Sequence, residues 1–175
     1  MLRLFRLVAI LAALVALARG AAPILQVAGP EKTLAFTAEE FAALPHTARE
    51  VLEPHEKKAH LYSGVVVHDL LTRVGVPSGE NFRGPALQLG VLVRSPDGYA
   101  VLFALAEFDE NFTSRAILLA DREDGQPTPA GAAPLRLIVP GDKRAARWAR
   151  MVASIEIVPV GAIAPRPRAK PQPGP

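Results

Sequence analysis

The sequence contains no cysteine among its 175 residues. Without a thiol, the chain cannot form a disulfide, use a cysteine nucleophile or offer a thiolate to a soft metal ion. It also lacks a phosphate-binding loop and a dinucleotide-binding glycine fingerprint. No serine lies in a nucleophile-elbow context. These absences exclude thiol chemistry, nucleotide-dependent enzymes of the common motifs, and serine hydrolases of the elbow type.

An excess of charge within the folded part is also absent. The formal net charge is +3, but six cations lie near the two ends of the chain: Arg3, Arg6, Arg19, Arg166, Arg168 and Lys170. Without these six, the net charge of the remaining chain is −3. General nucleic-acid binding is therefore not expected, because it requires a basic surface on the folded domain.

The composition predicts three parts. Residues 1–20 have two arginines, an uncharged apolar run and small residues before Ala21, the order of a Sec-type signal peptide. We therefore expect a periplasmic or secreted protein; an uncleaved membrane anchor is the alternative. Residues 24–160 are expected to form one domain, since half of the chain is apolar. Residues 161–175 are proline-rich and basic, which predicts a solvated tail.

Strand patterns outnumber helix patterns within this domain. Strands are expected at 23–29, 47–53, 116–121, 135–141 and 153–160, with a hairpin over 85–105 that turns at "SPDG". Thr37 and Glu40 have the spacing of a capping box and predict a helix start. Apolar spacing predicts a second helix within 65–76. The order indicates an α+β fold, with short helices around a mixed or barrel-like β-sheet.

Few side chains are candidates for metal or ligand binding. His55 and His60 flank a predicted turn, but their spacing is not that of a metal-binding pair, so no metal site is predicted. His68 lies in the first turn of the second helix, where it could face a cleft. Tyr99 follows the hairpin turn and either begins the return strand or faces a ligand.

The strongest local signal is the basic stretch "GDKRAARWAR". It follows a Pro-Gly pair and contains Lys143, Arg144, Arg147 and Arg150. Backbone N–H groups and guanidinium groups in such a turn can bind a phosphate or another small anion. The alternative is a solvated basic loop paired with nearby carboxylates.

Taken in order, several segments resemble the oxidoreductase molybdopterin-binding domain family, which has the sulfite oxidase fold. They run from about Val27 to Val158 and include "FTAEEFAALP", "YSGVVVHDLLTRVGV", "DGYAVLFALAEF", "AILLADREDGQP", "GAAPLRLIVPGDK" and "ARWARMVASIEIV". The resemblance implies molybdopterin as the cofactor. It also implies that Arg147 matches a residue that contacts the pterin and its phosphate, and that Arg150 replaces a lysine of the family motif. Lys143 and Arg144 would join them, and Tyr99 and His68 would line the pocket.

The resemblance also implies a molybdenum-ligating cysteine, near Leu52, Glu53, Pro54 and His55 in this chain. No cysteine is present there, so His55 or Glu53 would have to substitute. Two functions therefore remain open. One is an exported molybdopterin-dependent oxidoreductase that lacks its usual metal ligand. The other is a non-catalytic envelope module that binds a small anionic ligand or a protein partner. No catalytic residue is assigned by the sequence.

Overall fold

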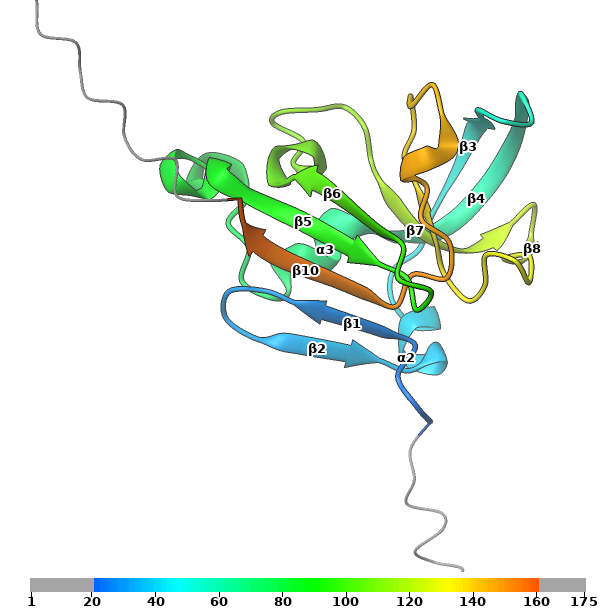
Figure 1. Ribbon diagram of the computed structural model, residues 1–175, viewed down its shortest axis with the longest axis horizontal. Helices are drawn as coiled ribbons and strands as arrows, with labels where there is room; N and C mark the ends of the chain where they lie inside the picture. The colour runs from blue at the N-terminus through cyan, green and yellow to red at the C-terminus, as the bar shows by residue number, and fades with distance from the viewer. Residues whose placement is uncertain (1–20, 161–175) are drawn as a thin grey trace, which may run out of the picture.

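The computed structural model describes residues 21–160. The predicted signal peptide and the predicted proline-rich tail lie outside these residues. Within them, no helix is both long and apolar enough to cross a membrane. The strands form two sheets, seen at the lower left and the upper right of Figure 1.

Sheet A has five strands in the order β2-β1-β10-β5-β6. The bounds are β1 Leu25–Ala28, β2 Thr33–Phe36, β5 Leu89–Arg94, β6 Ala100–Ala104 and β10 Ser154–Pro159. Strand β10 pairs parallel with β1 and antiparallel with β5, so the sheet is mixed. This pairing brings the two ends of the domain together in one sheet.

Sheet B is antiparallel, with the path β3-β4-β7-β8 and with β9 paired to β7. The bounds are β3 Thr47–Glu53, β4 Lys58–Val66, β7 Leu118–Glu123, β8 Gln126–Pro127 and β9 Arg136–Ile138. A bulge falls between Ser63 and Gly64. Gly64 is required there, because a Cβ at this position would lie 2.1 Å from the carbonyl oxygen of Leu119.

The helices are short: α2 Ala38–Ala42, α3 Val67–Thr72, and four 3₁₀ turns, η1 Gly79–Asn81, η2 Gly84–Gln88, η3 Leu105–Phe108 and η4 Ala145–Arg147. The capping box predicted at Thr37 and Glu40 is present at the start of α2. The second helix is shorter than its apolar period suggested. Val65 and Val66 belong to β4, where they pair with β7, and the helix begins at Val67.

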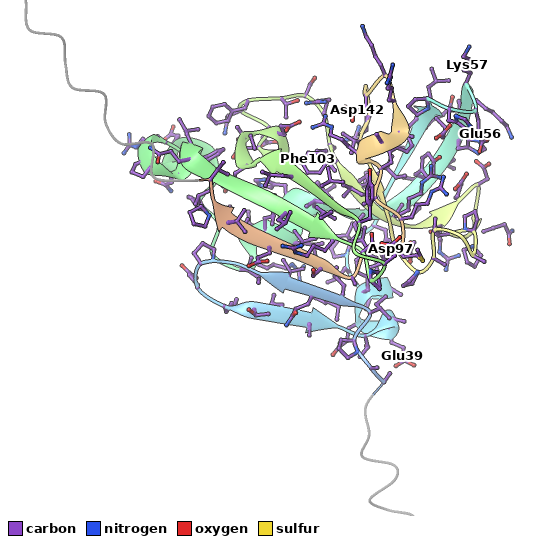
Figure 2. All side chains as sticks on the ribbon, in the orientation of Figure 1. Glu39, Glu56, Lys57, Asp97, Phe103 and Asp142 are labelled. Carbon is purple, nitrogen blue, oxygen red and sulfur yellow. The ribbon has the colours of Figure 1, made fainter. Side chains whose placement is uncertain are left out.

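The core lies on the inner face of sheet A and continues into sheet B. Val27, Val93 and Ile155 of sheet A are fully buried, as are Leu119 and Leu137 of sheet B. Figure 2 shows the tip of the β3–β4 hairpin, with Glu56 and Lys57, projecting away from this core. The strands thus form two open sheets around one core, in agreement with the predicted α+β class, and neither sheet closes into a barrel.

Candidate functional site

The basic stretch forms the connection between β9 and β10. Gly141 adopts φ +83°, a conformation that favours glycine, and the chain turns there after β9. The short turn η4 follows, and Trp148 then enters the core. The Trp148 indole donates a hydrogen bond to the Val139 carbonyl at 3.1 Å. The Trp148 side chain therefore anchors the turn, a role the sequence analysis did not assign.

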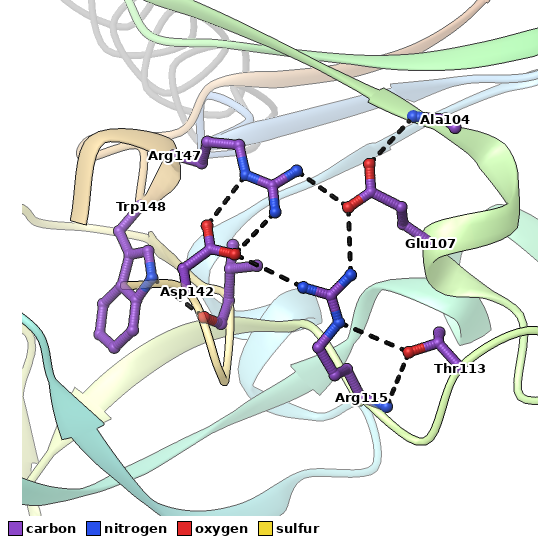
Figure 3. Close-up of polar contacts among 8 residues, drawn as sticks. Ala104, Glu107, Thr113, Arg115, Asp142, Arg147 and Trp148 are labelled. Carbon is purple, nitrogen blue, oxygen red and sulfur yellow. Dashed lines mark hydrogen bonds and ion pairs between the residues drawn. The ribbon is translucent and has the colours of Figure 1, made fainter. Parts of the chain in front are cut away.

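Arg147 lies in a closed network of four charged side chains (Figure 3). Its guanidinium donates two hydrogen bonds to the Asp142 carboxylate, at 2.9 and 2.7 Å, and one to Glu107 at 2.9 Å. Arg115 contacts the same two carboxylates at 3.3 and 3.4 Å. We call these four residues the ion-pair quartet. Its two positive and two negative formal charges cancel.

The quartet holds Arg147 firmly. Its guanidinium lies over the Phe103 ring, 4.7 Å from the centroid. The hydrogen bonds that Arg147 donates to Asp142 and, to a smaller extent, the one that it donates to Glu107 raise the pKa of Arg147 above its ordinary value. A guanidinium already paired with two carboxylates has little net charge to offer an incoming phosphate. This geometry favours a structural role for Arg147.

Tyr99 and Arg150 line a separate cavity of about 360 Å³, together with Ser95, Asp97 and Trp148. The Tyr99 hydroxyl donates a hydrogen bond to the Ala146 carbonyl and so closes the cavity against η4. Arg150 is exposed, and its carbonyl accepts a hydrogen bond from Ser95. The structure brings Tyr99 and Arg150 together, but not with His68.

His68 and Lys143 lie toward opposite ends of a groove made of three hollows that share lining residues. The first, about 400 Å³, includes His68, Asp69 and Glu110; the second, about 430 Å³, includes Glu50 and Pro140; the third, about 370 Å³, includes Leu52 and Lys143. Arg49 and Arg115 line both of the first two hollows. Val51 and Gly141 line both the second and the third. We call this surface the arginine groove.

Arg49 differs from Arg115 and Arg147 in its electrostatic setting. It projects from β3, is exposed, and has no carboxylate partner and no side-chain hydrogen bond within residues 21–160. Arg49 is therefore the cation that an anion in these two hollows would meet without a carboxylate partner among the described residues, whereas the charge of Arg115 is already paired with Glu107 and Asp142. Sequence analysis missed both residues, because they come from separate segments with no basic run. Arg144, which it did select, is exposed and forms no ion pair in the described part of the chain.

A second polar network connects strands β9, β3 and β7 of sheet B. Arg136 is buried and contacts Glu53 and Glu123, each at 3.4 Å. Its guanidinium packs against the rings of Tyr62 and Trp148, 5.7 and 5.4 Å from their centroids, and the two rings also contact each other edge to face. These contacts compensate the cost of burying the charge. Arg136 belongs to the "PLRLIVPG" segment, and its buried partners come from distant segments that no local motif connects with it.

His60 lies beside this network and is also buried. Its Nδ1 lies 2.7 Å from an Asp124 carboxylate oxygen and 3.4 Å from Glu123, and its Nε2 lies 3.2 Å from Glu56. The hydrogen bond with Asp124 is the main cause that raises the pKa of His60 above its ordinary value. His60 lies on β4, and its ring connects Glu56 in the turn of the β3–β4 hairpin with Asp124 in the loop after β7.

The fold was compared with known proteins. No family model matches the sequence, and no curated protein matches it. Among solved structures, the crystal structure of the sulfane dehydrogenase SoxCD from Paracoccus pantotrophus is similar, with a TM-score of 0.61 at 21% identity. The chain has a sulfite oxidase-like fold. The similarity covers 79% of this chain but 38% of that chain, so this protein spans well under half of its neighbour's length.

The residues near the expected thiolate position do not fit a metal held by the protein. Leu52 is exposed and apolar. Glu53 is buried and already bonded to Arg136 and to the backbone N–H of Glu56. His55 is exposed on the hairpin turn. Within residues 21–160, no three His, Asp or Glu side chains are arranged as a metal site.

Proposed function

We propose that the protein is a binding module with the molybdopterin-domain fold, and that it holds a small anionic ligand in the arginine groove without a protein ligand to molybdenum. One observation carries this proposal: Arg49 and Arg115 line the same two hollows, and Arg49 has no carboxylate partner among the described residues. An unpaired guanidinium in a concave site favours a phosphate, sulfate or carboxylate group.

The groove also limits what else the ligand carries. Asp69 and Glu110 line the same hollow as the two arginines, next to His68. A ligand that spans this hollow therefore presents its anionic group to Arg49 and hydrogen-bond donors to the carboxylates. A phosphorylated pterin meets both requirements, and its binding would need no metal. Lys143, at the far end of the groove, offers a further cation.

Molybdenum-dependent redox catalysis is the other function the fold suggests. The donor set does not favour it, because Glu53 is already paired with Arg136 and His55 lies at the exposed turn. A soft thiolate ligand is absent from the whole sequence. We therefore assign Glu53 to the buried ion pair, and we extend the proposal to an accessory role in the cell envelope after export by residues 1–20.

Titration with inorganic phosphate at constant ionic strength tests the groove. Arg49→Ala is expected to weaken phosphate binding about tenfold or more, the scale of one charge-assisted hydrogen bond. Arg144→Ala removes the same charge from an exposed position that does not line the groove, and it is expected to change the affinity less than about twofold. Equal effects of the two substitutions would contradict the assignment.

Metal analysis tests the second part of the proposal. Protein purified from a host that makes molybdopterin is expected to contain far less than one molybdenum per chain. Stoichiometric molybdenum would overturn the module assignment and direct attention to His55 as a ligand. The intact mass of the same preparation shows whether residues 1–20 have been removed.

A further inference from the structure

The outer face of sheet A has an unusual composition. Because side chains alternate along a strand, the strand register places one set of residues on the face opposite the core. The set is Ala35, Gln26, Ser154, Arg94 and Ala100; Thr33, Ala28, Glu156, Leu92 and Leu102; and Val158, Gly90 and Ala104. Small and apolar residues dominate, whereas the exposed face of an antiparallel sheet is usually polar.

This face is uncovered in the described part of the protein. Figure 1 shows sheet A with no helix lying in front of it, and α3 lies behind. Leu102 is 51% exposed, and Leu87 and Val160 beside it are each 48% exposed. These three side chains border an apolar hollow of about 330 Å³. Gly90 makes room for them, because a Cβ there would lie 2.8 Å from both Leu102 and Val160.

The charges on the face are self-complementary. Arg94 and Glu156 are the charged members of the set, and they project from neighbouring strands, β5 and β10. Both are exposed, and neither forms an ion pair within residues 21–160. An interface between two identical copies related by a twofold axis must be self-complementary. A patch with one cation beside one anion meets this condition, because the twofold axis can place each Arg94 against the partner's Glu156.

We infer that the outer face of sheet A is the interface with a second copy of this chain. The two faces pack against each other, the apolar surface around Leu102 is removed from water, and two equivalent ion pairs form between Arg94 and the partner's Glu156. The contact is isologous, so the dimer is closed and does not extend into a fibre. The arginine groove is built from other elements, so the inference stands independently of the proposed function.

Sedimentation equilibrium of the full-length chain over a range of concentrations tests this interface. The wild-type protein is expected to dimerise. Leu102→Arg places one cation of each copy in the apolar surface of the interface and is expected to raise the dimer dissociation constant at least tenfold. Leu61→Arg is the matched control, because Leu61 is a leucine 47% exposed on β4 of sheet B. It is expected to leave the dissociation constant within about twofold of wild type.

Charge reversal makes the test specific for the pairing. Arg94→Glu alone and Glu156→Arg alone each create two like-charge contacts and are expected to weaken the dimer. The double variant restores opposite charges and is expected to recover most of the wild-type affinity. A wild-type chain that stays monomeric, or a dimer that Leu102→Arg leaves unchanged, overturns the inference. Failure of the double variant to recover affinity overturns the Arg94–Glu156 pairing.

Discussion

Replacing Arg147 with alanine should destabilise the fold, because the side chain holds the β9–β10 connection to the rest of the domain. Three hydrogen bonds to the carboxylates of Asp142 and Glu107 would be lost, together with the packing on Phe103. A fully buried ion pair broken on one side costs about 3–5 kcal/mol, and an exposed one about 0–1 kcal/mol. The Arg147 side chain is 33% exposed and that of Asp142 is 12% exposed. We expect a loss of about 2 kcal/mol, between these limits.

Urea denaturation measures this loss directly, provided that the slope with denaturant concentration stays unchanged. Arg144→Ala serves as the control, since Arg144 lies in the same connection but is exposed and forms no ion pair in the described residues. Its expected effect is below about 0.5 kcal/mol. Arg147→Lys keeps the charge but cannot reproduce the two-pronged contact with Asp142, so it should recover less than half of the stability.

A double-mutant cycle separates the pair from the general cost of truncation. Arg147→Ala, Asp142→Ala and the double variant should give a coupling energy of about 1–2 kcal/mol. A loss below about 0.5 kcal/mol for Arg147→Ala, with no coupling to Asp142, would refute the reasoning. The connection would then be a solvated basic loop, and Arg147 would again be free to bind an anion.

Two further predictions concern stability. The hydrogen bond with Asp124 is the main cause that raises the pKa of His60 in the folded state, so the contribution of His60 to the free energy of unfolding is fully present below its unfolded pKa of about 6.5 and is lost as the pH rises through the folded pKa. The difference in unfolding free energy between wild type and His60→Gln should therefore shrink with rising pH. A difference that does not depend on pH would contradict this prediction. Gly64→Ala should cost more than about 2 kcal/mol, because its Cβ would meet the Leu119 carbonyl. Gly131→Ala, with no heavy atom within 4 Å of the added Cβ, should stay within about 0.5 kcal/mol in the same denaturation assay.

The elements that sequence analysis predicted well are those determined by local chemistry. The capping box at Thr37 and Glu40 depends on a spacing of three residues, and the structure contains it. The β5–β6 hairpin was equally clear, because "SPDG" separates two apolar runs. The second helix was predicted too long. Its first residues, Val65 and Val66, are held in β4 by pairing with β7, and this long-range partner leaves no trace in the local apolar period.

The candidate site was harder to predict, because its residues are brought together by topology. The predicted basic cluster is divided in the structure: Arg147 joins the ion-pair quartet, Arg150 lines the cavity of Tyr99, and Lys143 lines the end of the groove. The carboxylate of Glu107, which neutralises Arg147, lies 40 residues away in the chain. Charge counted along the sequence therefore overestimated the charge available to a ligand.

The buried pair of Glu53 and Arg136 connects the fold to the question of catalysis. Glu53 lies at the end of β3, in the region where the family resemblance implies a metal-ligating thiolate. Recruiting Glu53 to a metal would leave Arg136 buried with Glu123 as its remaining carboxylate contact, and a half-compensated buried charge is costly. The aromatic rings of Tyr62 and Trp148 both pack against the guanidinium of Arg136. This part of the core is thus organised around an ion pair that competes with metal binding, which supports the proposed module that keeps the fold and binds an anionic ligand at Arg49.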